Sequence, residues 1–258
     1  MTPAMSFRPG STSYVYDAGL AENAERLAAA GLVQDIELVL FELDDGQTNF
    51  PDSETVSRLK RVRDTYGVSY TVHLPLDLRC APEGLSHPSL VQARRVIEIT
   101  RPLTPWATVA HLDGDGYDQT GWRAQALSAL RQVVAWAAPS PVAVENLETY
   151  DAAIFASLLA ESGARRCVDV GHLWKQGRDP LPLLDAWLPE TRVVHLHGCQ
   201  NGRDHISLAR MPPDVLDPVL RRLAAFAGVL TLEVFGEDDF FASRAALLAA
   251  MERITNGA

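Results

Sequence analysis

Cysteine is scarce in this sequence, and the three cysteines, Cys80, Cys167 and Cys199, lie far apart with no paired spacing. Such a pattern suggests neither a disulfide framework nor a zinc finger. Long apolar runs are also missing, because none approaches the roughly 20 residues that a membrane-spanning helix needs. The first residues lack the basic region and the apolar stretch of a signal peptide. We therefore expect a cytoplasmic protein that has no membrane partner.

Basic residues are in short supply as well. Lys and Arg together number 23 against 33 for Asp and Glu, which gives a net charge of -10. Proteins that follow a phosphate backbone present a basic face, so this balance argues against a nucleic-acid partner. Bound metal ions would neutralise a few of the carboxylates without reversing that argument. The first predicted strand is not followed by a glycine-rich phosphate loop, which disfavours a doubly wound dinucleotide-binding fold.

The sequence does contain a regular alternation of short apolar strands and amphipathic helices. Predicted strands are Ser11–Val15, Ile36–Glu42, Tyr70–Leu74, Ala107–Leu112, Val142–Asn146, Cys167–Val170, Val193–His197 and Leu230–Phe235. Predicted helices are Leu20–Ala30, Ser53–Tyr66, Pro88–Thr100, Gly121–Ala137, Ala152–Ser162, Leu181–Leu188, Pro213–Ala225 and Ser243–Ile254. Because this is the element count of a (β/α)8 barrel, we predict an α/β fold with a single TIM-barrel domain over residues 1–258. Its active site is expected at the C-terminal ends of the strands.

Ionisable side chains recur where the predicted strands end. They are Glu42, His73, His111, Glu145, Asp169, His195 with His197, and Glu233. Side chains alternate between the two faces of a strand, so the residue two positions earlier points the same way. At those earlier positions, Thr71, Val109 and Ala143 are small or β-branched and suit a crowded barrel interior. The inward face is thus predicted to carry packing residues low in the barrel and ligands at its top.

Taken singly, each of these residues has an ordinary structural explanation. A strand histidine such as His111 is commonly a hydrogen-bonded core residue, and Glu145 or Glu233 alone can be half of a buried ion pair. Asp169 can cap the turn that follows it, and Glu42 can belong to an acidic loop. Burying the whole set without a cation, however, would leave several charges unpaired at a high cost in free energy. The set therefore favours a shared divalent-metal site.

Several stretches resemble the xylose isomerase-like TIM barrels, a superfamily that includes the family 2 apurinic endonucleases and sugar epimerases. These stretches are TVHLP, VAHLDG, VENLE, VDVGH, VHLHG, DHISL and TLEVF. In the endonuclease-like branch, the resemblance implies metal ligands at His73, His111, Glu145, Asp169, His172, His195, His205 and Glu233. That branch usually has an aspartate two residues before the loop histidine, where this sequence has Arg203, with Asp204 directly before His205. We therefore expect one or two divalent ions, Zn, Mn or Co, in preference to three.

Within the superfamily, the stretches VVHLHG and GRDHISL resemble the cobamide-remodelling phosphodiesterases of bacteria. This resemblance implies a corrinoid substrate and hydrolysis of the nucleotide-loop phosphodiester of adenosylcobamides, such as adenosylcobalamin and adenosylpseudocobalamin. The expected products are adenosylcobinamide phosphate and an α-riboside. The expected catalytic residues are Glu145, Glu233 and His195. The expected substrate-binding residues are His197, Arg203, Asp204 and Glu42, although His197 can instead orient the neighbouring ligand His195.

Other functions stay open at this point. Glu145, Asp169, His195 and Glu233 alone resemble the single-metal quartet of keto-sugar epimerases. A sugar isomerase or epimerase is therefore the main alternative, although it would not need the histidines on the third and fourth strands. The acidic balance weighs against an apurinic endonuclease. The number of ligands weighs against a non-catalytic metal or corrinoid carrier. The sequence does not specify an oligomeric state.

Overall fold

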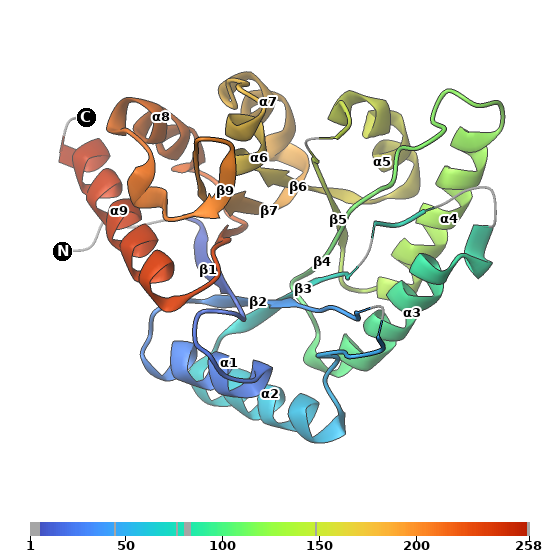
Figure 1. The fold of residues 1–258 in the computed structure, drawn as a ribbon, viewed down its shortest axis with the longest axis horizontal. Coiled ribbons are helices and arrows are strands. Elements are labelled where there is room, and N and C mark those ends of the chain that lie inside the picture. The colour runs from blue at the N-terminus through green and yellow to red at the C-terminus, as the bar shows by residue number, and fades with distance from the viewer. Residues whose placement is uncertain (1–5, 44, 76, 80–83, 148, 257–258) are drawn as a thin grey trace.

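The computed structural model describes residues 6–43, 45–75, 77–79, 84–147 and 149–256. Eight parallel strands close into a barrel in the order β1-β10-β7-β6-β5-β4-β3-β2, and the helices surround it (Figure 1). The barrel strands are β1 Arg8–Thr12, β2 Asp35–Val39, β3 Ser69–His73, β4 Ala107–Ala110, β5 Val142–Glu145, β6 Arg165–Asp169, β7 Thr191–Leu196 and β10 Val229–Leu232. The predicted (β/α)8 architecture is therefore confirmed.

Eight of the α-helices among the described residues overlap the predicted ranges. They are α1 Leu20–Ala29, α2 Ser53–Tyr66, α3 Pro88–Thr100, α4 Trp122–Ala137, α5 Ala156–Ser162, α7 Leu181–Trp187, α8 Pro213–Leu223 and α9 Glu237–Asn256. One further helix, α6 Val170–Lys175, was not predicted. Helix α2 shows why its ends could be predicted. The Asp52 carboxylate accepts a hydrogen bond from the Thr55 amide at 2.7 Å, and Gly67 ends the helix at a φ of 72°. An aspartate before a helix and a glycine after it are common boundary residues.

Several predicted elements have other bounds in the structure. Strand β1 lies three residues before the predicted segment, and α9 begins six residues before its predicted start. Strand β2 ends at Val39, where its pairing with β3 ends, and does not continue to Glu42. The side chain of Asn49 accepts a hydrogen bond from the Phe41 amide and donates one to the Val39 carbonyl. A side chain thus takes the place of a further strand residue, and the chain leaves the barrel there.

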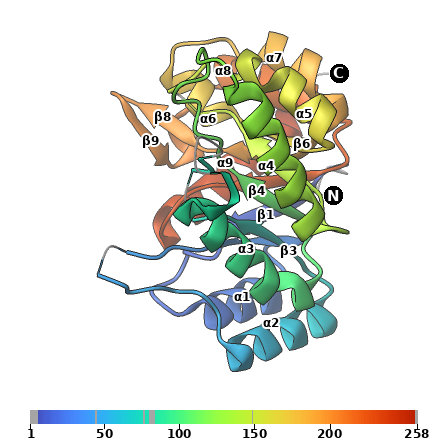
Figure 2. The ribbon, with the colours of Figure 1, turned by 90° about the vertical axis from the view of Figure 1, so that its right-hand side faces the viewer.

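The long connection after β7 forms a two-stranded hairpin, made of β8 Gly198–Gln200 and β9 Arg203–Ile206. Asn201 and Gly202 form its turn with φ values of 54° and 76°, as expected for an Asn-Gly hairpin turn. Figure 2 shows that this hairpin and the connection after β2 project from the same side of the barrel. Cys80 and part of the predicted connection Pro75–His87 lie outside the described residues. Among the described helices, none is long and apolar enough to span a membrane.

The barrel interior contains a separate small apolar cluster, which we call the floor. It consists of Ala107, Val109, Ala143, Cys167 and Val193, with Trp106 packed against them. Val109, Ala143, Cys167 and Val193 are positions that the alternation of strand side chains assigns to the inside. The packing layer predicted below the ligands is therefore present.

Candidate metal centre

Six ionisable residues meet at the C-terminal end of the barrel. Each comes from a different strand and lies either in its last residues or directly after its end. They are His73, His111, Glu145, Asp169, His195 and Glu233. Strand register explains the meeting, since parallel strands end at the same edge of the barrel. Asp169 on β6, for example, is the direct pairing partner of His195 on β7. The structure thus brings together the residues that the sequence analysis placed at strand ends, apart from Glu42 and from His197, which belongs to a neighbouring cluster.

Glu145 is the hub of this arrangement. Its Oε2 atom lies 3.4 Å from His73 Nε2 and 3.3 Å from His111 Nε2. These three residues, which we call the outer group, have ligand atoms close enough to share one cation. The side chain of Glu145 is almost fully buried, whereas that of His111 is 25% exposed. The outer group therefore connects the barrel interior with solvent.

The same Glu145 oxygen also belongs to a deeper set, which we call the inner group. Its members are Glu145, Asp169, His195 and Glu233, and all of them are buried. His195 Nδ1 lies 3.3 Å from Glu145 Oε2 and 3.2 Å from Glu233 Oε2. Asp169 Oδ2 is 3.9 Å from the same nitrogen. The inner and outer groups are therefore adjacent and share one carboxylate.

Hydrogen bonds on the far side of each imidazole fix which nitrogen faces the carboxylates. His73 Nδ1 contacts the Leu74 carbonyl at 2.9 Å, and His111 Nδ1 contacts Asp77 Oδ1 at 2.9 Å. His195 Nε2 contacts Glu37 Oε2 at 3.0 Å. Carbonyl and carboxylate oxygens only accept hydrogen bonds, so these nitrogens donate. The opposite nitrogen of each neutral ring then presents a lone pair to the group, which is the usual arrangement of a metal-binding histidine.

Several buried polar atoms in the two groups have no hydrogen-bond partner among the described residues. They include Glu145 Oε2, His195 Nδ1 and Glu233 Oε2, which face one another across about 3 Å. Buried unpaired polar atoms are costly, and a divalent cation between them removes that cost. Histidine nitrogens with carboxylate oxygens form a donor set that suits Zn, Mn or Co. The residues present therefore fit a metal centre.

The carboxylates and histidines of the site shift one another's pKa values. Burial alone would raise the pKa of Glu145, but His195 and His111 outweigh it and hold that pKa well below its ordinary value. Burial likewise opposes the charged form of His111, yet Glu145 and Asp77 raise its pKa to about 10. Protons on the histidines thus supply the positive charge that a cation would otherwise bring. Metal ions and protons compete for such a site.

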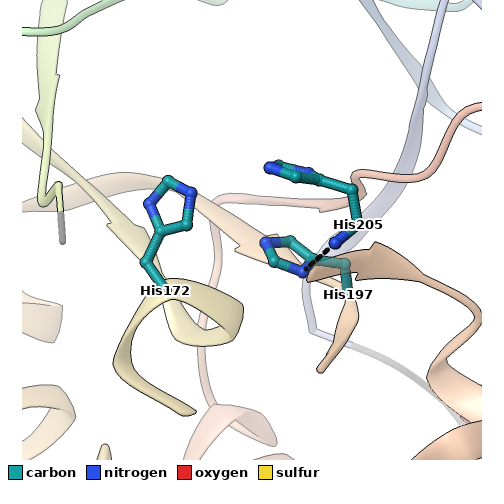
Figure 3. Close-up of side chains that lie close together, drawn as sticks. All are labelled: His172, His197 and His205. Atoms are coloured by element: carbon teal, nitrogen blue, oxygen red, sulfur yellow. Dashed lines mark hydrogen bonds between the residues drawn. The ribbon is translucent and has the colours of Figure 1, made fainter. Parts of the chain in front are cut away.

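His172, His197 and His205 form a second cluster (Figure 3). It adjoins the inner group, since His197 Nε2 lies 3.1 Å from Asp169 Oδ2. Asp169 caps α6 by accepting a hydrogen bond from the His172 amide at 2.6 Å, which fixes His172 near it. The rings of His197 and His205 are stacked with centroids 4.1 Å apart. His205 Nδ1 contacts the Glu233 carbonyl at 3.2 Å.

Both ring nitrogens of His197 are engaged within the protein. Its Nδ1 accepts a hydrogen bond from the His205 amide at 3.0 Å, and its Nε2 donates to Asp169 Oδ2 at 3.1 Å. The residue is fully buried. A side chain at Gly171 would overlap its ring. Of the two roles that the sequence left open, this geometry favours orienting a ligand, here Asp169, over contacting a substrate.

A cavity of about 480 Å³ opens over the two groups. Its lining includes residues of both groups and extends to Asp204, His205 and Phe235. A second cavity of about 460 Å³ is lined by residues such as Leu184 and Arg222, and no member of the inner or outer group lines it. Only the first of these two cavities therefore gives a substrate access to the metal centre.

The remaining predicted substrate residues are spread around the rim. Asp204 lines the cavity and pairs with Lys175 at 2.7 Å. Arg203 is exposed at the start of β9 and is not among the described residues that line the cavity. Glu42 was placed at a strand end, and the structure corrects this position, since β2 stops three residues earlier. Its carboxylate pairs instead with Gln92 and with Arg95 on α3.

Two acidic residues that contact the metal centre were missed in the sequence. Glu37 lies inside β2 and holds His195, and Asp77 follows β3 and holds His111. Glu37 had a signal, because an acid interrupts the apolar run of its strand. Asp77 had none, because nothing in a loop of that composition distinguishes it from a solvated aspartate.

A family model described as xylose isomerase-like TIM barrel matches residues 24–256. A search of the curated proteins found no match. A solved structure of a D-tagatose 3-epimerase-like protein aligns with a TM-score of 0.74 and 19% identity, covering 97% of this chain and 99% of that chain. Endonuclease IV from Thermus thermophilus aligns with a TM-score of 0.67 and 22% identity, over 95% of this chain and 99% of that one.

A D-allulose 3-epimerase from Methylomonas sp., solved in complex with D-allulose, aligns with a TM-score of 0.67 and 16% identity, covering 99% of each chain. At these identities the structural likenesses show the fold. The family match covers most of the sequence, and the chain belongs to the xylose isomerase-like TIM barrel family.

Proposed function

We propose that this member of the xylose isomerase-like TIM barrel family is a metal-dependent phosphodiesterase that hydrolyses the nucleotide-loop phosphodiester of adenosylcobamides. Adenosylcobalamin and adenosylpseudocobalamin are the proposed substrates, and adenosylcobinamide phosphate and an α-riboside are the products. The observation that carries the proposal is the single Glu145 oxygen shared by the inner and outer groups. The residues that would hold two cations thus meet at one carboxylate below one open cavity.

Paired sites of this kind suit phosphoryl transfer. Two divalent ions held there would activate a water molecule and stabilise the departing oxygen of an in-line displacement. Glu145 would belong to both sites, with Asp169, His195 and Glu233 holding the ion of the inner site and His73 and His111 holding that of the outer one. We assign the catalytic role to Glu145, His195 and Glu233, because their orphaned buried atoms face one another.

The cavity also has features that suit a large, partly planar substrate. Phe235 lines it with 46% of its surface exposed and lies 5.6 Å from the His205 ring. Tyr14 stands 6.4 Å from Phe235, and Phe41 lies 6.2 Å from Tyr14. Such a row of rings offers a stacking surface to a flat group. Tyr14 and Phe41 are not among the described residues that line the cavity, so the row would serve a substrate that extends beyond the cavity, as a corrinoid with its base would and a monosaccharide would not.

The charge of the chain supports a substrate with a single phosphodiester over a nucleic acid. A DNA duplex presents many phosphates and requires a broad basic face. This protein has a net charge of -10. Two basic residues at this end of the barrel are partly neutralised, since Lys175 pairs with Asp204, which lines the cavity, and Arg79 lies 3.8 Å from Asp113. One phosphate at the metal centre would not need more.

A sugar epimerase is the second candidate. The inner group alone provides the quartet that such an enzyme uses, and two of the similar structures are described as epimerases or epimerase-like. In that case the outer group would serve only to bind sugar hydroxyls.

The two candidates can be separated directly. Purified protein is incubated with Mn²⁺, Zn²⁺ or Co²⁺ and, in parallel, with adenosylcobalamin, keto-sugars or abasic DNA. We expect release of the α-riboside and adenosylcobinamide phosphate, detected by chromatography and mass spectrometry. Sugar epimerisation without cleavage of any phosphodiester would overturn the proposal.

A further inference from the structure

Two buried carboxylates on β2 belong to neither the inner nor the outer group. Asp35 and Glu37 are two residues apart on the strand, so both side chains point to the same face, and both are fully buried. Asp35 hydrogen-bonds to Ser69 at the start of β3. Glu37 instead reaches His195 on β7. One strand thus offers an acid that contacts a residue of the inner group and a matched acid that contacts none.

The contact between Glu37 and His195 fixes the orientation of the imidazole. Glu37 Oε2 accepts a hydrogen bond from His195 Nε2 at 3.0 Å, and neither residue is exposed to solvent. The lone pair on Nδ1 then faces Glu145 and Glu233. A ring held the other way round would point an N–H at the place where a cation belongs.

Glu37 differs from the partners of the other histidines in the two groups. His73 rests on a backbone carbonyl, which carries no net charge. His111 rests on Asp77, whose side chain is 54% exposed. Among the described residues that hold these rings, Glu37 alone is both charged and buried. A charge acts more strongly on its neighbours in the protein interior than at the surface.

The carboxylates of the site can also be counted. The inner group contains the three carboxylates of Glu145, Asp169 and Glu233. Glu37 adds a fourth buried negative charge in direct contact with this group. An inner group that loses this charge would hold a divalent ion less tightly.

We propose that Glu37 is a positioning residue that orients His195 through its Nε2 atom and sets the affinity of the inner group for a divalent cation. This inference rests on the metal centre of the proposed function but not on the substrate. It concerns the affinity for the metal, which can be measured without any turnover.

The test is a zinc titration of the variant Glu37→Gln, in competition with a chelating dye. Glutamine keeps the size and one acceptor oxygen of the side chain but removes its charge. The zinc affinity of the inner group should fall by about 10- to 100-fold, the usual effect of losing such a partner. A repeat in a His111→Ala background removes a ligand of the outer group, so that the inner group is measured alone.

Asp35→Asn is the matched control, because it neutralises an equally buried acid on the same face of the same strand. It should bind zinc with the affinity of the wild type. Unchanged zinc affinity in Glu37→Gln would overturn the proposal. An equal loss in both variants would also overturn it and assign the effect to the barrel as a whole.

A second measurement needs no variant, should Glu37→Gln fail to fold. In long-range ¹H–¹⁵N spectra of the zinc-loaded wild type, His195 should carry its proton on Nε2 and bind zinc through Nδ1. The opposite assignment would refute the positioning role. Zinc binding that follows these expectations in a protein without phosphodiesterase activity would support this inference and overturn the proposed function.

Discussion

The two ends of the barrel are built on the same strands and have opposite chemistry. At the C-terminal end, which we call the mouth, the inner and outer groups bury charged side chains. Several of their polar atoms lack partners among the described residues. Two residues lower on the same strands, the floor is filled by alanine, valine and cysteine side chains. On β5, for example, Ala143 packs in the floor and Glu145 is the hub of the mouth. The period-two alternation of a strand thus separates packing from chemistry by a single step.

The floor is also closed from below by a stack of side chains. The guanidinium carbon of Arg192 lies 4.1 Å from the centroid of the Trp106 ring, and that of Arg8 lies 5.0 Å from it. The indole nitrogen of Trp106 donates a hydrogen bond to the Arg192 carbonyl at 3.3 Å. Arg192 Nε also lacks a hydrogen-bond partner among the described residues, but the stack is made of ring contacts, whereas the mouth packs several buried carboxylates against one another. We infer that the floor contributes stability and that the mouth gives up stability for binding.

The largest effect should come from the hub of the mouth. Glu145→Gln removes the one charge shared by both groups, so both cation sites should weaken, and turnover should fall by about 1,000-fold or more because metal-ion catalysis depends on them. The fold should persist, because glutamine keeps the size of the side chain and removes a charge that burial disfavours. Zinc content and phosphodiesterase rate measure the outcome. Near-normal turnover would remove Glu145 from the site.

A substitution in the floor should have the opposite effect, on stability and not on metal binding. Trp106→Ala should lower the free energy of unfolding by about 3 kcal/mol, since it removes a large ring that packs against the apolar cluster. The zinc stoichiometry should stay at the wild-type value. Chemical denaturation and metal analysis of the same preparation test both halves. A loss of metal with no loss of stability would show that the two ends of the barrel are not separable.

The outer group can be tested separately from the inner group, because His111 belongs only to the outer one. His111→Ala removes a ligand that only the outer group uses, so the protein should bind one zinc ion where the wild type binds two. Activity should fall with it if two ions are needed for phosphodiester hydrolysis. An epimerase would keep its rate, because the inner group is intact. Metal analysis and the parallel substrate assays give both readings.

The strand alternation made much of this site predictable. His73, Glu145 and Asp169 each end a strand, and their positions follow from that pattern alone. The predicted position of Glu42 at a strand end was wrong because the apolar run continues beyond Val39. Only the pairing with β3 shows where the strand stops. A hydrogen bond from Asn49, ten residues further along the chain, sets that limit. No local pattern in the sequence contains it.

The same reason explains why the supporting acids were missed. Glu37 and His195 are 158 residues apart, and their contact exists only because the barrel closes. The stacking of His197 on His205 likewise depends on the hairpin of β8 and β9. Alternation predicts which face a side chain occupies. It does not predict which residue of another strand that side chain meets.

The smallest expected effect concerns Asp35, the acid of β2 that lies nearest the floor. Burial raises its pKa from 3.8 to about 6, against the effect of its hydrogen bond to Ser69. A group whose pKa is higher in the folded state stabilises the fold below its unfolded pKa, and this contribution is lost as the pH rises through the folded value. The shift corresponds to at most about 3 kcal/mol.

The variant Asp35→Asn has no ionisable group at this position. The difference between its free energy of unfolding and that of the wild type should therefore increase between pH 4 and pH 6 and stay level above that. Because the amide also disturbs the contact with Ser69, we expect a net gain of about 1 kcal/mol at pH 7. Denaturation of the chelated proteins across this range measures the difference. A flat difference would mean that Asp35 carries no charge penalty. The floor and the mouth would then differ in their ligands alone and not in how they tolerate charge.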